Sequence, residues 1–252
     1  MKSEITEMMS LRWIARGLIL TACLFANGAW ADEIPTPFAY RVLGWSDDSA
    51  RWGFQEQGDY GAGMVFSPGG GVYVIDAVAN RFVFKHFLST GDSASERGDS
   101  WARRTADATA RRDLGTARSL GLRGAPGTIV YERPKMVWLD YDSELKQFGD
   151  KRVTFDHAGH TYTVMLQDAF MPDKGSLTGT KSKLSVSIRR DDNAWQILQA
   201  DSTYWRPYMA YRVVHVSISP DDQKVGILIE AVENGLEGQK QAHYKGVTGL
   251  LP

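Results

Sequence analysis

The chain has 252 residues, with 29 Lys and Arg against 30 Asp and Glu, and a single cysteine. Its formal net charge of −1 provides no bulk attraction for nucleic acid, so we expect no nucleic-acid partner. The single cysteine, Cys23, lies in a segment that we interpret as a leader. Thiol catalysis, iron–sulfur clusters and cysteine-bound zinc are therefore excluded for the mature protein, and the sequence predicts no cofactor and no metal.

Residues 1–31 are typical of a secretory signal peptide. Arg12 and Arg16 precede a mostly apolar run from Gly17 to Ala26, and Ala29-Trp30-Ala31 supplies the small residues that signal peptidase recognises. We therefore expect cleavage after Ala31 and a periplasmic or secreted protein. The run is shorter than a membrane span requires, so we expect no transmembrane span in the mature form.

A second interpretation of the same segment is a lipoprotein signal. Leu20-Thr21-Ala22-Cys23 fits the pattern that precedes a lipid-modified cysteine, so a lipid anchor at Cys23 is the alternative to a freely exported protein. The mass of the amino-terminal peptide of the mature protein distinguishes the two.

Residues 32–252 are predicted to form a single β-rich domain. The first part, from Phe38 to Phe87, indicates a four-stranded meander. Its expected strands are Tyr40–Leu43, Arg51–Phe54, Val72–Asp76 and Arg81–Lys85.

A helical insertion is predicted near residues 95–122. Trp101 to Leu120 is rich in Ala and Arg, Ser93 and Glu96 have the spacing of a capping box, and Gly121 is a plausible stop. A stripe of small residues on one face is suited to close packing on a sheet. It consists of Ala102, Ala106, Ala110, Leu114 and Ala117.

After the helix the pattern is β again. The expected strands are Thr128–Tyr131, Met136–Tyr141, Arg152–Phe155, His160–Leu166, Lys183–Arg190, Trp195–Leu198 and, at the end, Tyr244–Leu250.

One hairpin occurs twice. Val42 to Phe54 aligns at a constant offset with His215 to Ile227, each copy having an apolar strand, a Ser-x-Asp turn and a second apolar strand entered through Gly. If the repeat is structural, Trp45 and Ile218 must occupy equivalent strand positions.

These hairpins resemble the strand-turn-strand units of TolB-like and WD40-like propeller blades. The whole mature chain is similar to a family of predicted secreted bacterial proteins catalogued as domain of unknown function 2259. This similarity depends on Val42 to Gly53, Val72 to Phe82, the Arg-rich helix and the closing His243 to Thr248. It implies a compartment and a shape, with no catalytic residue to carry over.

The expected fold class is therefore mainly β, a β-rich α+β fold of antiparallel sheets with propeller-like hairpin units and one packed helix. Two arrangements fit. The domain is either a propeller whose middle blades have diverged or a smaller β structure with a helix packed on it, and the presence of two recognisable units favours the second.

Two sets of side chains are candidate metal ligands. His157 and His160 could bind a metal, but Ala158-Gly159 between two β segments favours a hairpin turn. The pairs Asp47-Asp48, Asp191-Asp192 and Asp221-Asp222 also stand at predicted turns, where Asp side chains accept bonds from backbone N–H groups.

The chain has no Gly-x-Ser-x-Gly, Gly-x-x-x-x-Gly-Lys or His-Glu-x-x-His motif, so the sequence favours a non-catalytic protein. Seven Arg and three Asp between Arg97 and Arg123 make the helix basic. The arginines either recognise an anionic partner, such as a phospholipid surface or a cell-wall polymer, or form a solvated face.

Aromatic residues supply the candidate binding surface. Tyr204, Trp205, Tyr208 and Tyr211 crowd a segment broken by Pro207. They either stack on a sugar or peptide or plug the core as an aromatic corner.

From these features we expect an exported bacterial envelope protein, a non-catalytic module that binds an envelope protein or polymer or assists its assembly. The alternatives are a hydrolase with an active site assembled by the fold, and a carbohydrate-binding or ligand-binding module.

Overall fold

The computed structural model describes residues 39–59, 68–90, 97–133, 150–175, 179–234 and 240–252. The chain divides into two units, Met1–Thr36 and Pro37–Pro252, and every described residue belongs to the second. The predicted signal peptide with Cys23, the Ser93–Glu96 capping pair and the expected strand Met136–Tyr141 lie outside the described residues. Within the described ranges, no helix is long and apolar enough to cross a membrane.

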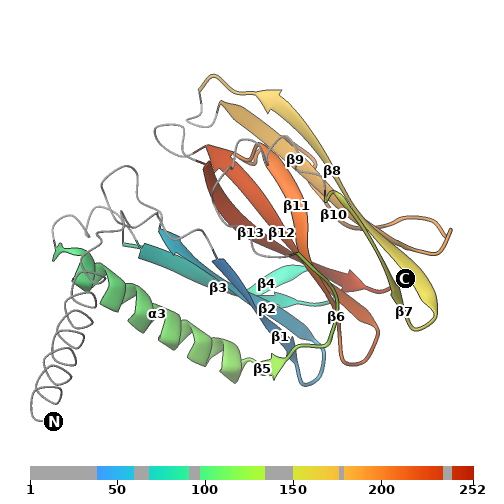
Figure 1. Cartoon of the computed structure of the whole chain (residues 1–252), viewed down its shortest axis with the longest axis horizontal. Coiled ribbons are helices and arrows are strands. Elements are labelled where there is room, and N and C mark those ends of the chain that lie inside the picture. The colour runs from blue at the N-terminus through green and yellow to red at the C-terminus, as the bar shows by residue number, and fades with distance from the viewer. Residues whose placement is uncertain (1–38, 60–67, 91–96, 134–149, 176–178, 235–239) are drawn as a thin grey trace, which may run out of the picture. The chain divides into compact units, whose positions relative to one another are not determined.

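Three antiparallel sheets make up most of the described chain (Figure 1). Sheet A has the order β4-β3-β2-β1-β5, with β1 (Ala39–Ser46), β2 (Arg51–Asp59), β3 (Pro68–Asp76), β4 (Arg81–Ser89) and β5 (Leu122–Ala125). Sheet B has the order β13-β12-β11-β6, with β6 (Thr128–Glu132), β11 (Ala210–Ile218), β12 (Lys224–Asn234) and β13 (Lys240–Leu250). Sheet C has the order β10-β9-β8-β7, with β7 (Arg152–His157), β8 (His160–Pro172), β9 (Thr180–Arg190) and β10 (Gln196–Ala200).

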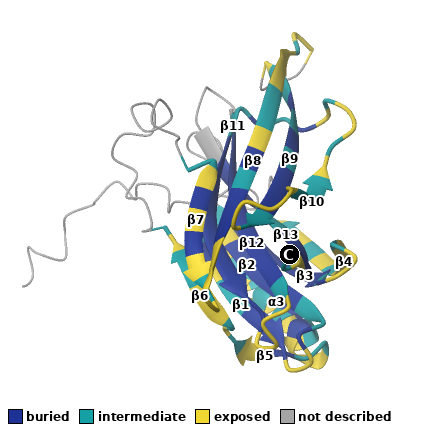
Figure 2. Cartoon of the chain, turned by 90° about the vertical axis from the view of Figure 1, so that its right-hand side faces the viewer, coloured by how far each residue is buried: buried dark blue, intermediate teal, exposed yellow. Residues whose placement is uncertain are grey.

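Sheet B is the middle layer, because its two faces belong to two different cores. One face packs on sheet C, where Val216 and Ile227 join Val164 and Val186 in one apolar cluster. The other face packs on sheet A, where Val214 and Leu228 join Trp52 and Phe54. Strands buried on both faces have long apolar runs, as β11 and β12 do (Figure 2).

The helix α3 (Asp99–Ser119) covers the other face of sheet A (Figure 1). Leu114 and Ala117 pack against Val72 and Val74 of β3, and Ala102 is also buried. The small-residue stripe was thus correctly predicted to face the sheet. Gly98 is the N-cap of α3, without a capping bond from a side chain, and the helix ends before Gly121 with its φ of 91°.

The predicted fold class is confirmed as mainly β, with antiparallel sheets and one packed helix. The described strands form three separate open sheets, so a propeller-like closure is not confirmed. β8 and β9 are longer than expected, and β5 was missed because it follows the helix directly and has only four residues.

The internal repeat is structural. Trp45 pairs with Trp52 next to the first turn, and Ile218 pairs with Val225 next to the second. Both turns use a Ser hydroxyl bonded to an Asp carboxylate two residues on, and each contains one residue with positive φ at the equivalent position. These residues are Ser46, Asp48 and Ser49 in the first copy and Ser219, Asp221 and Asp222 in the second.

A third strand extends each copy of the repeat. β5 pairs with β1, β6 pairs with β11, and Pro126-Gly127 joins β5 to β6. The chain therefore crosses from sheet A to sheet B between the two copies of the hairpin.

Candidate functional site

The four predicted aromatic residues do not share one surface. Tyr211 is fully buried, with its hydroxyl 2.6 Å from the Ser182 hydroxyl, and Tyr208 is buried with its ring edge against Tyr211. Trp205 is 57% exposed and stacks on Arg206, and Tyr204 lies beside Lys183. Tyr208 and Tyr211 thus occupy the core as an aromatic corner, and only Trp205 and Tyr204 present rings near the surface.

Arg206 joins this segment to sheet C through a buried ion pair with Asp201, which follows β10. Its guanidinium donates two bonds to the Asp201 carboxylate, at 2.5 and 2.8 Å, with both side chains buried. Burial alone would raise the pKa of Asp201, but the bonds from Arg206 and from the Leu184 N–H lower it. The pair is structural, since both of its charged groups are already partnered.

His157 is the last residue of β7 and His160 is the first residue of β8, and the two side chains contact different partners. Ala158 and Gly159 form the turn between β7 and β8, both with positive φ, as the turn interpretation predicted. His157 lies 3.0 Å from Asp222 and His160 lies 2.9 Å from Asp191. In the ranges that the structure describes, no three His, Cys, Asp or Glu side chains are placed to hold a metal ion.

All five histidines of the chain lie in described ranges, and four of them contact a carboxylate. These are His86 with Asp113, His157 with Asp222, His160 with Asp191 and His243 with Glu233. His215 is the exception. The residue is 1% exposed, and neither ring nitrogen has a hydrogen-bond partner among the described residues.

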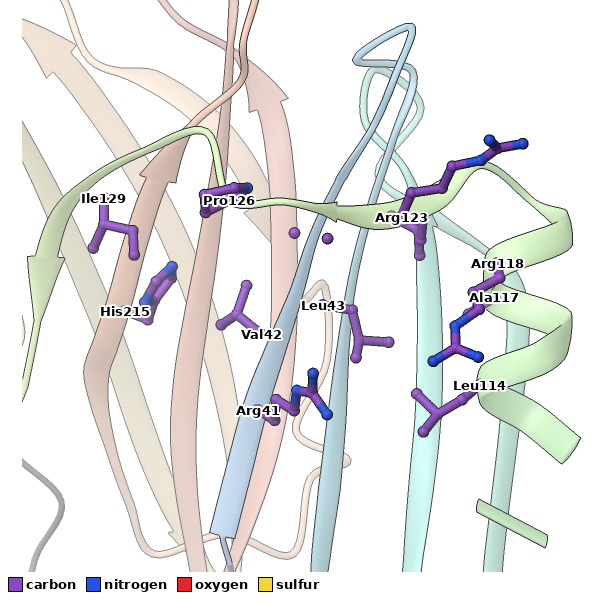
Figure 3. A pocket seen from close by; sticks show the side chains of 13 residues that line it. Arg41, Val42, Leu43, Leu114, Ala117, Arg118, Arg123, Pro126, Ile129 and His215 are labelled. Atoms are coloured by element: carbon purple, nitrogen blue, oxygen red, sulfur yellow. The ribbon is translucent and has the colours of Figure 1, made fainter. Parts of the chain in front are cut away.

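His215 lies at a cavity of about 210 Å³ between sheets A and B and the end of α3 (Figure 3). The cavity is lined by β1, by the carboxyl end of α3, by residues 122–129 and by His215 of β11. The lining residues are Arg41, Val42, Leu43, Gly44, Leu114, Ala117, Arg118, Leu122, Arg123, Gly124, Pro126, Ile129 and His215.

A β-bulge in β11 directs His215 into this cavity. The register shifts between Val213 and His215, so Val214 and His215 lie next to each other on the face toward sheet A. The repeat alignment places Val42 at the position of His215. Since Val42 also lines the cavity, the two equivalent positions lie at the same cavity, one apolar and one a histidine.

The segment from β5 to β6 covers one side of the cavity, because it passes very close to β1 and β11. A Cβ on Gly44, whose φ is 90°, would lie 2.2 Å from the Ala125 carbonyl oxygen, and one on Gly127 would lie 2.0 Å from that of Ile218. Only glycine permits this approach. The two glycines thus hold β5 and β6 directly over the bulged strands.

Burial lowers the pKa of His215 to about 4, so the ring is neutral at physiological pH. A neutral imidazole has one N–H donor and one acceptor nitrogen, and here both are unpaired. Leaving a buried polar group without a partner costs about 1–3 kcal/mol, so a ligand that pairs with His215 recovers free energy that the fold alone does not.

Three arginines surround the opening. Arg118 lies with Leu43 and Leu114 on the α3 side of β1, whereas His215 lies on the other side of that strand, and Arg123 extends outward and lies 3.8 Å from Asp47 (Figure 3). Glu132, which opposes His215 in register, lines a neighbouring cavity that Arg41 also borders. The lining itself thus holds three arginines and no carboxylate, with Asp47 and Glu132 close to two of the arginines.

The carboxyl end of α3 also borders the cavity, and the partial negative charge there opposes an anion. Arg51 donates a hydrogen bond of 2.9 Å to the Leu120 carbonyl, and Arg118 lies in the last turn. These two cations offset the helix dipole at this point.

Sequence reasoning did not find this site. Arg118 and Arg123 were counted in the basic helix region, but Val213 to Ile218 reads as an ordinary buried strand. The one usable signal was the substitution of His215 for Val42 in the repeat alignment.

No family model, curated protein or solved structure matches this chain. The similarity to domain of unknown function 2259 therefore remains a prediction.

Proposed function

We propose that the chain is an exported bacterial envelope protein that acts as a non-catalytic binding module, and that the cavity at His215 binds an oxyanion of the phosphate type. Export depends on the signal predicted in residues 1–31. The observation that carries the binding site is the ring of His215, whose two nitrogens are buried without a partner among the described residues and which lines a cavity that arginines also border.

An oxyanion fits the side chains around the cavity. Its oxygens can accept a hydrogen bond from the His215 N–H, and the arginines that border the same cavity favour a negative charge there. A cation would face these arginines, and an apolar group would leave His215 unpaired.

The two alternatives have less support. A hydrolase that uses a histidine base needs a nucleophilic hydroxyl beside that histidine, whereas His86 contacts Asp113 and Arg112. For a carbohydrate-binding module, the predicted surface keeps Trp205 exposed but has Tyr208 and Tyr211 in the core.

Titration with inorganic phosphate, followed by NMR of the histidine rings, tests the proposal. We expect a saturable shift of the His215 resonances, lost in His215→Leu and weakened severalfold in Arg118→Gln. His160→Gln, which removes an exposed histidine at a turn, is the matched control and should bind as the wild type does. Unchanged His215 resonances at saturating phosphate would overturn the proposed function.

A further inference from the structure

The exposed side of α3 carries a row of arginines that leads to the cavity. Arg104, Arg111 and Arg118 follow one another at intervals of seven residues, and all three are exposed. Seven residues rise about 10.5 Å in an α-helix and nearly complete two turns, so the three side chains lie on one face and span about 21 Å. Arg118, at the end of this row, lines the cavity.

One exposed carboxylate lies within the row. Asp107 is three residues after Arg104 and four before Arg111, so it lies between them and offsets part of their charge. Asp113 is buried toward β4, where it pairs with His86 and Arg112. The basic face of α3 is therefore continuous with the arginines at the cavity.

We propose that the ligand is a linear polyanion of the phosphate type, with its terminal group in the cavity at His215 and its next groups along α3 beside Arg111 and Arg104. This inference rests on the proposed function, because the cavity must first bind a single phosphate. Beyond the proposed function, it names the class of ligand: a chain of phosphate groups with a free end.

A linear polymer fits this surface better than a bilayer does. Helices that lie on membranes bury large apolar side chains on the face that contacts the lipid. In the described part of the chain, the exposed large hydrophobic residues include none from α3. The face of α3 therefore offers charge without an apolar anchor, in a single row rather than a sheet.

Arg104 and Arg111 should add affinity without contacting the cavity. Exposed ion pairs are individually weak, so two further arginine–phosphate pairs on one tethered ligand should tighten binding roughly tenfold over inorganic phosphate. The increment should fall as the salt concentration rises, because it is electrostatic.

Calorimetric titrations with inorganic phosphate and with a linear polyphosphate longer than the 21 Å row test this inference. We expect roughly tenfold tighter binding of polyphosphate by the wild type. The double variant Arg104→Gln/Arg111→Gln should lose that increment and bind inorganic phosphate unchanged. The double variant Arg152→Gln/Lys174→Gln removes the same charge from exposed positions on β7 and after β8, and should keep the increment.

Three results would overturn the polymer ligand: equal affinity for phosphate and polyphosphate, the same loss of increment in both double variants, or binding of phosphatidylglycerol vesicles without the polyphosphate increment. An oligothymidine without a terminal phosphate that binds as tightly as polyphosphate would contradict anchoring by the end group. Failure of the wild type to bind inorganic phosphate contradicts the proposed function itself, so the two failures are distinguishable.

Discussion

His215 is a buried residue whose hydrogen-bonding groups the fold leaves unpaired. Its counterpart in the repeat, Val42, shows that an apolar side chain suits the equivalent position. A histidine there costs stability, since both ring nitrogens lose water on folding and gain no partner. Under the proposed function, a bound oxyanion supplies the partner that the fold does not.

The first prediction concerns the stability of the unliganded protein. His215→Leu replaces the unpaired ring by an apolar group of similar size, so the free energy of unfolding at pH 7 should rise by about 1 kcal/mol. Urea denaturation without phosphate measures it. A decrease of that size would mean that His215 has a partner in the folded protein.

The second prediction is the contribution of His215 to the pH dependence of stability. Burial lowers the pKa of His215 to about 4, whereas the unfolded chain protonates the ring near its ordinary value of about 6.5. Between these values the unfolded state binds more protons. The contribution of the neutral ring is thus fully present above about pH 6.5 and is lost as the pH falls toward 4, by about 3 kcal/mol in total.

The measurement is the difference in unfolding free energy between wild type and His215→Leu across this pH range, because other titrating groups cancel in the difference. A difference independent of pH would contradict a buried, neutral His215. Saturating phosphate should reduce the loss, since a bound anion stabilises the protonated ring.

At the scale of elements, the two hairpins and the strands β5 and β6 form the site together. β5 adds to the first copy of the repeat and β6 to the second, and the joint between them passes over Trp45 and Ile218. The cavity lies where this connection, β1, β11 and α3 meet.

The third prediction tests this joint with a matched pair of glycines. Gly127→Ala should destabilise the protein by about 2–4 kcal/mol, because Gly127 has φ of 65° and a Cβ would lie 2.0 Å from the Ile218 carbonyl oxygen. Gly115→Ala, in α3 with open space around the new Cβ, should stabilise it by up to about 1 kcal/mol.

Thermal unfolding of both glycine variants measures the contrast. Equal effects of the two substitutions would show that the joint does not need a glycine.

Local patterns predicted the elements well where turn chemistry and periodicity agree. The hairpin turns at Asp48 and Asp221 and the helix end at Gly121 follow from residue types that those conformations require. The short strand β5 and the bulge at Val214 depend on contacts between distant segments. The site could not be predicted from sequence, because the bulge and the β5–β6 joint position His215.

At the scale of the whole described unit, sheet B stabilises two cores at once. It packs on sheet C through one face and on sheet A through the other, although its strands β11 to β13 come last in the chain. The order of the sheets in the stack therefore differs from their order in sequence, which periodicity cannot reveal. The cavity lies at the border between sheets A and B, so its shape depends on this stacking.

The binding of an oxyanion at His215 is the central claim, and a crystal structure with a heavy-atom analogue of phosphate, such as tungstate, tests it most directly. We predict an anomalous peak in the cavity, within hydrogen-bond distance of a ring nitrogen of His215. A cavity without a peak, or a His215 ring bonded to another protein group, would contradict the account.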